Sequence, residues 1–155
     1  HQSDVEKVFN LIRSIEKTVS KEGKEKLYLV SIGEKAEYIA SLFKMRQKNT
    51  QEVLDALKKL IEEINDAKQE QINKQMPQET FSIYWILKKE GFSKPERMAN
   101  KMNTVFQNYP HWRRSEKHER EAKKGLYKVL IDEDVKDVSA LAKRLISILK
   151  GGQRG

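Results

Sequence analysis

The chain has no cysteine, only three prolines and seven glycines among its 155 residues, and no long hydrophobic run. Without cysteine it forms neither a disulfide nor a thiolate site, so a zinc site would need histidine and carboxylate ligands. Little proline and glycine, with abundant Ala, Leu, Ile, Glu and Lys, favours a helical protein over a β-sandwich or a disordered tail. No apolar run approaches the roughly 18 residues of a spanning helix, and no stretch of the sequence has the pattern of a signal peptide. We therefore expect no membrane contact and a cytoplasmic location.

Positive charge is concentrated in the second half of the chain. The net charge is +8, and residues 1–77 hold 14 Lys and Arg against 13 Asp and Glu. Residues 78–155 hold 17 Lys and Arg against 10 Asp and Glu. Such an asymmetry indicates a basic surface for nucleic acid or an acidic partner, although a solvated lysine-rich face is the commoner explanation.

Apolar residues recur at helical spacing, and no segment alternates as a strand would. The predicted fold class is all-α, with about seven helices in a bundle. Ser3 and Glu6 form a capping box, Asn49 or Thr50 caps the third helix, and Ser93-Lys94-Pro95-Glu96 is a helix start signal. We expect helices over about 4–21, 25–43, 50–74 and 81–87, then from 93 to near Tyr109, from Ser115 to about 130, and from Asp134 to 149.

Met76-Pro77 is the clearest break, because the residue before a proline is driven out of the α region. It predicts two helical subdomains, a long-helix half over 1–76 and a basic half of shorter helices over 77–150, with 151–155 as a flexible tail. The polar segment 65–76 is compatible with either helix or linker. Because the chain starts at His1 and ends in Gly-Gly-Gln-Arg-Gly, we expect a C-terminal piece of a longer protein.

Three patterns suggest catalysis and each has a simpler explanation. Residues 129–134, Val-Leu-Ile-Asp-Glu-Asp, resemble a Walker B strand, but no G-x-x-x-x-G-K-[ST] loop accompanies them. Ser115, His118 and Glu119 could form a nucleophile, base and orienting group, although a serine at a helix start normally caps the backbone. A carboxylate cluster on the third helix is interleaved with lysines, which favours a solvated face; it comprises Glu62, Glu63, Asp66 and Glu70. We therefore predict no enzymatic activity, no metal site and no cofactor for this chain.

The stretch from Asn108 to Leu130 is the most distinctive part of the sequence. An aromatic residue and two arginines precede a basic helix in which Lys117, Arg120 and Lys124 fall on one face. Arginine suits bidentate contacts with phosphate or carboxylate, and an exposed tryptophan can stack on a base or a partner. Alternatively, the tryptophan is a core anchor and the cations are solvated. The predicted partner or DNA contacts are Trp112, Arg113, Arg114, Lys117, Arg120, Lys123 and Lys124.

This stretch also resembles a known family. The segments Tyr109-Pro110-His111-Trp112-Arg113-Arg114-Ser115, Glu119-Arg120-Glu121 and Leu126-Tyr127-Lys128-Val129-Leu130 look like the end of the R (motor and restriction) subunit of type I restriction-modification enzymes. One departure is Ala122-Lys123-Lys124-Gly125, where another arginine and a better helix former than Gly125 would be expected.

The resemblance implies a docking role in a larger enzyme. R subunits of this family hydrolyse ATP with Mg²⁺, translocate double-stranded DNA and cut it, in N-terminal domains that this chain lacks. The C-terminal helical domain helps to attach the motor to the methyltransferase core. The expected partners are therefore the methyltransferase and specificity subunits and, as a second candidate, double-stranded DNA. An alternative of another class is a stand-alone nucleic-acid-binding helical module.

Overall fold

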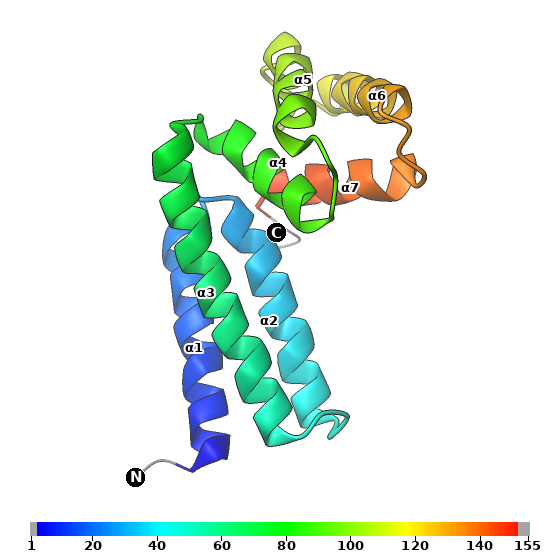
Figure 1. Cartoon of the computed structure of the whole chain (residues 1–155). Coiled ribbons are helices and arrows are strands. Elements are labelled where there is room, and N and C mark those ends of the chain that lie inside the picture. Colours follow the sequence, from blue (N-terminus) through cyan, green and yellow to red (C-terminus); the bar gives the residue numbers. More distant parts are fainter. Residues whose placement is uncertain (1–2, 152–155) are drawn as a thin grey trace. The chain divides into compact units, whose positions relative to one another are not determined.

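In the computed structural model, residues 3–151 are described and every regular element among them is an α-helix. This confirms the predicted all-α class (Figure 1). No helix in this range combines the length and apolar character that a bilayer span requires. The seven helices are α1 (Asp4–Glu22), α2 (Tyr28–Lys44), α3 (Thr50–Lys74), α4 (Gln78–Lys89), α5 (Pro95–Asn108), α6 (Glu116–Asp132) and α7 (Val138–Leu149).

The chain divides into two compact units, residues 1–75 (unit 1) and 76–155 (unit 2). Between them, Gln75 ends α3 in the left-handed conformation, with φ 52°, and Met76-Pro77 follows. The polar end of α3 is helical as far as Lys74, so the choice left open for that segment is decided in favour of helix up to this residue.

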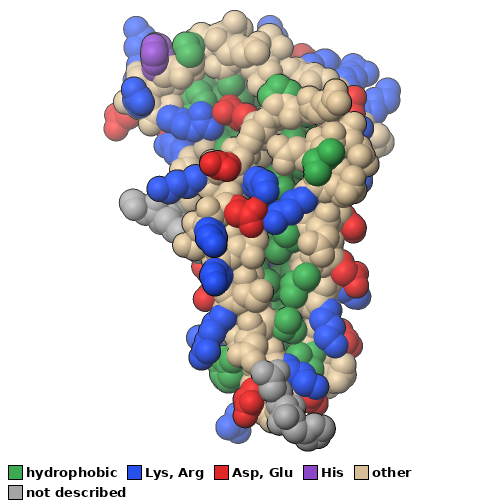
Figure 2. All heavy atoms as spheres, turned by 90° about the vertical axis from the view of Figure 1, so that its left-hand side faces the viewer, with side chains coloured by type: hydrophobic (Ala, Val, Ile, Leu, Met, Phe, Trp, Pro, Cys, Tyr) green, Lys and Arg blue, Asp and Glu red, His purple; other side chains and the backbone are tan. Residues whose placement is uncertain are grey.

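Unit 1 is a three-helix arrangement in which α1, α2 and α3 pack against one another. Apolar side chains recurring every three or four residues face inward, among them Val8, Ile12, Ile15, Leu57 and Ile64. On the face seen in Figure 2, hydrophobic side chains gather in a lengthwise seam with charged side chains on both flanks.

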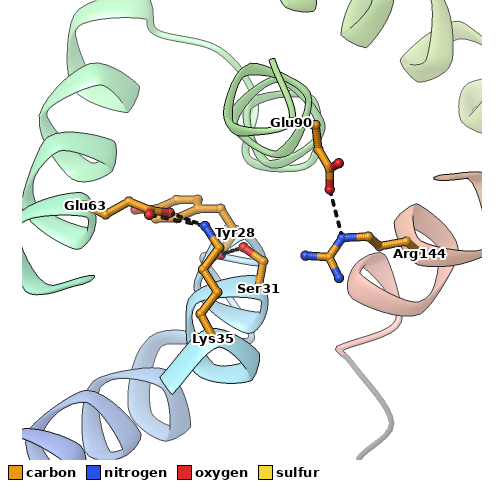
Figure 3. A network of polar contacts seen from close by, with 6 residues as sticks. All are labelled: Tyr28, Ser31, Lys35, Glu63, Glu90 and Arg144. Carbon is orange, nitrogen blue, oxygen red and sulfur yellow. Dashed lines mark hydrogen bonds and ion pairs between the residues drawn. The ribbon is translucent and has the colours of Figure 1, made fainter. Parts of the chain in front are cut away.

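Polar contacts supplement this core. Lys35 of α2 forms an ion pair with Glu63 of α3 at 3.3 Å, and Ser31 Oγ donates a hydrogen bond to the carbonyl oxygen of Tyr28 (Figure 3). Burial, helped by the charge of Glu22, raises the pKa of the Tyr28 phenol to about 12. Glu63 belongs to the carboxylate cluster noted in the sequence, and here it holds two helices together.

Unit 2 is a closed ring of four helices, in which α4 packs on α5 and α7, and α6 also packs on α5 and α7 (Figure 1). Every residue of α4 from Thr80 to Leu87 is buried, so this short helix is the centre of the unit. Gly91 follows α4 with φ 91°, as expected of the glycine that terminates a helix.

Local capping signals agree with the structure at several helix ends. Ser3, Asn49 and Ser115 each accept a hydrogen bond from a backbone N–H of the first turn. The second helix was predicted to begin near Glu25 but begins at Tyr28, because residues 23–27 form turns closed by bonds to Glu22.

Two helix starts were predicted wrongly. Helix α5 has Pro95 as its first residue, but the cap is Lys94 rather than Ser93, because the helical conformation is disfavoured for the residue before a proline. Helix α7 begins at Val138, not at Asp134. Asp134 instead takes the left-handed conformation (φ 58°) that closes α6, with Val135 N–H bonding to the carbonyl of Leu130 at 3.0 Å.

After α7, Gly151 is left-handed with φ 92°, which terminates the helix as expected of glycine at this position. The rest of the predicted tail, residues 152–155, and His1 lie outside the described residues.

Candidate docking surface

Residues 109–115 form a tight elbow between α5 and α6. Three backbone hydrogen bonds close it: Trp112 N–H to Tyr109 O at 3.1 Å, and the N–H groups of Arg114 and Ser115 to His111 O, both at 2.9 Å. Ser115 then caps α6, accepting from the N–H of His118 at 3.3 Å. The most distinctive stretch of the sequence is therefore a rigid connection between two helices.

Trp112 lies in the core of unit 2, with 2% of its surface exposed. Its ring packs on Phe106 of α5 with centroids 4.9 Å apart. The prediction of Trp112 as a contact with DNA or a partner is therefore wrong, and the core-anchor alternative is correct. The indole supplies more apolar surface than any other side chain of the elbow, so it goes inward.

Arg113 is engaged within unit 2. Its guanidinium lies over the Trp112 ring, 4.5 Å from the centroid. Nε donates to the carbonyl oxygen of Leu149 at 3.1 Å, and Nη2 pairs with Glu79 at 2.9 Å. Arg113 therefore ties the elbow to the end of α7 and the start of α4, and its predicted contact with a partner or DNA stays a prediction.

The suggested Ser115-His118-Glu119 group does not form a proton relay. The Ser115 hydroxyl accepts a backbone hydrogen bond, and Glu119 pairs with Lys150. The His118 ring contacts the rings of His111, stacked with centroids 6.0 Å apart, and Tyr109, edge-on with centroids 6.1 Å apart. Its Nδ1 is buried and has no hydrogen-bond partner among the described residues. Ser115 thus has a capping role, as the alternative interpretation had it.

The Walker B-like residues are likewise helical. Val129 to Asp132 form the last residues of α6, and Glu133 and Asp134 form its cap. Glu133 forms ion pairs with two cations of α5, Arg97 at 3.2 Å and Lys101 at 2.8 Å. The hydrogen bond from Lys101, more than any other interaction, lowers the pKa of this carboxyl, against the opposing effect of burial.

The remaining predicted cations lie on or beside α6. Arg114, Lys117, Arg120 and Lys124 are exposed, whereas Lys123 is half-buried on the flank of the helix. The opposite face of α6 is buried through Ala122, Leu126 and Leu130. Lys128 is also exposed and was not among the predicted contacts. Its spacing of four residues from Lys124 already placed it on the same helix face in the sequence. We call Lys117, Arg120, Lys124 and Lys128 the α6 stripe.

Gly125 explains why α6 departs from the expected pattern at this point. A Cβ built on Gly125 would lie 2.6 Å from Cγ1 of Val105 on α5. The two helices approach so closely here that only glycine fits without a shift. Close packing of α5 on α6 therefore accounts for the poor helix former at this position.

A cavity of 480 Å³ lies near the start of α7 in unit 2. Phe92, Val135 and Leu141 contribute apolar surface, while the ion pair between Glu90 and Arg144, 3.2 Å long, lies at its wall (Figure 3). The lining mixes acidic, basic and apolar groups and does not select one ligand chemistry.

Among residues 3–151, no group of three or more His, Asp or Glu side chains is placed to hold a metal ion. Comparison of the chain with protein-family models, with curated proteins and with solved structures found no match.

Proposed function

We propose that the chain is a non-catalytic docking domain of the R subunit of a type I restriction enzyme, linking the motor to the methyltransferase core. The single observation that carries the proposal is the elbow at residues 109–115. The residues on which the resemblance rests form a helix junction held by Trp112 and Arg113. A segment of this kind fixes the direction of α6 and ties the elbow to α4 and α7, so the surface of unit 2 is held in one arrangement.

Rigid presentation suits a docking domain, because binding costs less when the contact surface is ordered beforehand. The chemistry of the elbow supports the same role: the Ser115 hydroxyl and the donors of Arg113 are used within the unit. ATP and Mg²⁺ belong, in this proposal, to the motor domain of the parent subunit, and the nuclease activity belongs to its N-terminal part.

The test is made in the parent R subunit. Deleting the region that corresponds to this chain should leave ATPase and nuclease domains folded and should abolish the complex with the methyltransferase and specificity subunits. Size-exclusion chromatography measures the complex, and single-turnover ATP hydrolysis reports on the motor. An intact complex after the deletion would contradict the proposal.

A point variant sharpens this test. Trp112→Ala removes the anchor of the elbow, so it should weaken the complex, whereas Tyr38→Ala in unit 1 alters a side chain that is 65% exposed and should not. Equal loss from both variants would argue against a role for the elbow.

A further inference from the structure

The α6 stripe is a regular line of positive charge. Lys117, Arg120, Lys124 and Lys128 are spaced by three, four and four residues, which places them on one side of the helix. From Lys117 to Lys128 the helix rises about 16 Å at roughly 1.5 Å per residue. All four residues are exposed, and the elbow and the buried face fix the helix that carries them.

The charge of the stripe is largely uncompensated. Elsewhere in unit 2, acidic residues pair with cations that hold the helices together: Glu79 with Arg113, Glu133 with Arg97 and Lys101, and Glu119 with Lys150. Within the described residues, only Lys124 of the stripe has an ion pair, with Glu121 at 3.3 Å, and its side chain stays 73% exposed. Such an exposed pair contributes little and is easily exchanged for another anion.

The stripe also lacks the apolar centre of a typical protein interface. The cores of such interfaces are depleted in lysine and enriched in aromatic residues. The aromatic side chain nearest in sequence to the stripe's start, Trp112, is buried. Among the described residues of unit 2, Ile131 is the only exposed large hydrophobic side chain. One isoleucine does not form an interface core, so a polyanion fits this surface better than a protein does.

We propose that the α6 stripe binds the phosphate backbone of double-stranded DNA. The major groove of B-DNA is about 12 Å wide, so a stripe of about 16 Å laid across it reaches phosphates of both strands. Contacts to phosphate oxygens fix the position of a protein on the duplex but carry no sequence information. The proposed contact, which is to phosphates, is therefore independent of base sequence. This inference goes beyond the docking function and does not depend on it.

The experiment is fluorescence anisotropy of a labelled mixed-sequence duplex titrated with the whole chain at several salt concentrations. Four phosphate contacts predict a slope of log affinity against log salt of roughly −3.6, which is a loss on the order of 100-fold between about 50 and 200 mM salt. The double variant Lys117→Gln/Lys124→Gln should halve that slope, so its loss over the same range should be roughly tenfold.

The matched control is Lys136→Gln/Lys143→Gln, which removes the same charge from two exposed lysines outside α6. It should keep the slope of the unaltered chain. An equal decrease in slope for both double variants would mean diffuse charge attraction and would overturn the stripe as a site.

Two further outcomes would overturn the proposal. The first is no binding at low salt while circular dichroism shows the helices intact. The second is displacement of the labelled duplex by polyglutamate at a lower charge concentration than by unlabelled duplex, which would assign the stripe to an acidic protein partner. Displacement by an unlabelled duplex of different sequence at a lower charge concentration than polyglutamate requires supports the proposal. None of these measurements involves the methyltransferase core, so their failure is distinguishable from failure of the docking function.

Discussion

At the scale of single residues, Trp112 decides what the elbow is. The sequence alone did not decide whether Trp112 stacks on a partner or anchors the core, because tryptophan serves both purposes. The difference arises from Phe106, six residues earlier, whose ring centroid lies 4.9 Å from that of Trp112, and from Arg113, whose guanidinium lies over the indole. Such contacts depend on how α5 meets the elbow, which no local pattern in the sequence reveals.

Replacing Trp112 by alanine should therefore be costly. We expect Trp112→Ala to lower the free energy of unfolding by about 3–5 kcal/mol, because the hydrogen-bonded elbow does not move inward to fill the cavity that the indole leaves. Urea unfolding followed by circular dichroism measures the loss. Tyr38→Ala, at an exposed position, should change the value by less than about 0.5 kcal/mol. A Trp112→Ala variant as stable as the unaltered chain would show that the indole is no anchor.

Gly125 gives a second prediction at this scale. In an isolated helix, alanine stabilises by about 1 kcal/mol relative to glycine. Here the added methyl group meets Val105, and overpacking of this kind costs typically about 1–3 kcal/mol. We therefore expect Gly125→Ala to destabilise the chain.

The double variant Gly125→Ala/Val105→Ala removes the obstructing atoms. It should be less destabilised than the sum of the two single changes, a coupling that a double-mutant cycle in urea measures. Additive effects would indicate that the close approach of α5 and α6 imposes no constraint on position 125.

At the scale of elements, the helix boundaries show what local signals can and cannot predict. Ser3, Asn49 and Ser115 were recognised because a capping side chain bonds to backbone only three residues away. Near α7 two acidic residues compete, Asp134 and Asp137, and both are plausible caps. The choice falls on Asp137 because the closing turn of α6 already requires the left-handed conformation at Asp134.

The contact between the end of α6 and α5 has a predictable pH dependence. The pKa of Glu133 is lowered in the folded chain, first by the hydrogen bond from Lys101. A group with a depressed folded pKa stabilises the fold above its unfolded value, about 4.3 for glutamate, and this contribution is lost as the pH falls through the folded pKa. Glu133→Gln should thus destabilise the chain at neutral pH, and the two unfolding curves should converge in acid.

Asp132→Asn is the control for that comparison, because Asp132 is exposed and adjacent and makes no ion pair among the described residues. The difference in the free energy of unfolding between Asp132→Asn and the unaltered chain should not shrink as the pH falls. A Glu133→Gln effect of constant size from neutral pH down to strong acid would mean that the ionised carboxylate contributes nothing.

At the scale of the whole molecule, the sequence predicts the fold class better than the site. Most helices are recognisable from the sequence because each buries one apolar face, which gives a helical spacing of apolar residues; α4, buried all round from Thr80 to Leu87, is the exception. Which cations are available to a partner depends on which are already paired within the unit. Predicting those pairs requires knowing where Glu79, Glu119 and Glu133 lie in space. Arg113 and Lys117 look alike in the sequence, yet the first holds the unit together and the second faces solvent.

Direct association of this chain with a methyltransferase core is the most immediate test of the proposed docking function. Sedimentation velocity of the isolated chain, mixed with the complex of methyltransferase and specificity subunits from the same enzyme, measures it. The docking function predicts that the chain sediments with the core, and that Trp112→Ala reduces the bound fraction. A chain that sediments alone at every core concentration, while remaining helical by circular dichroism, would contradict it.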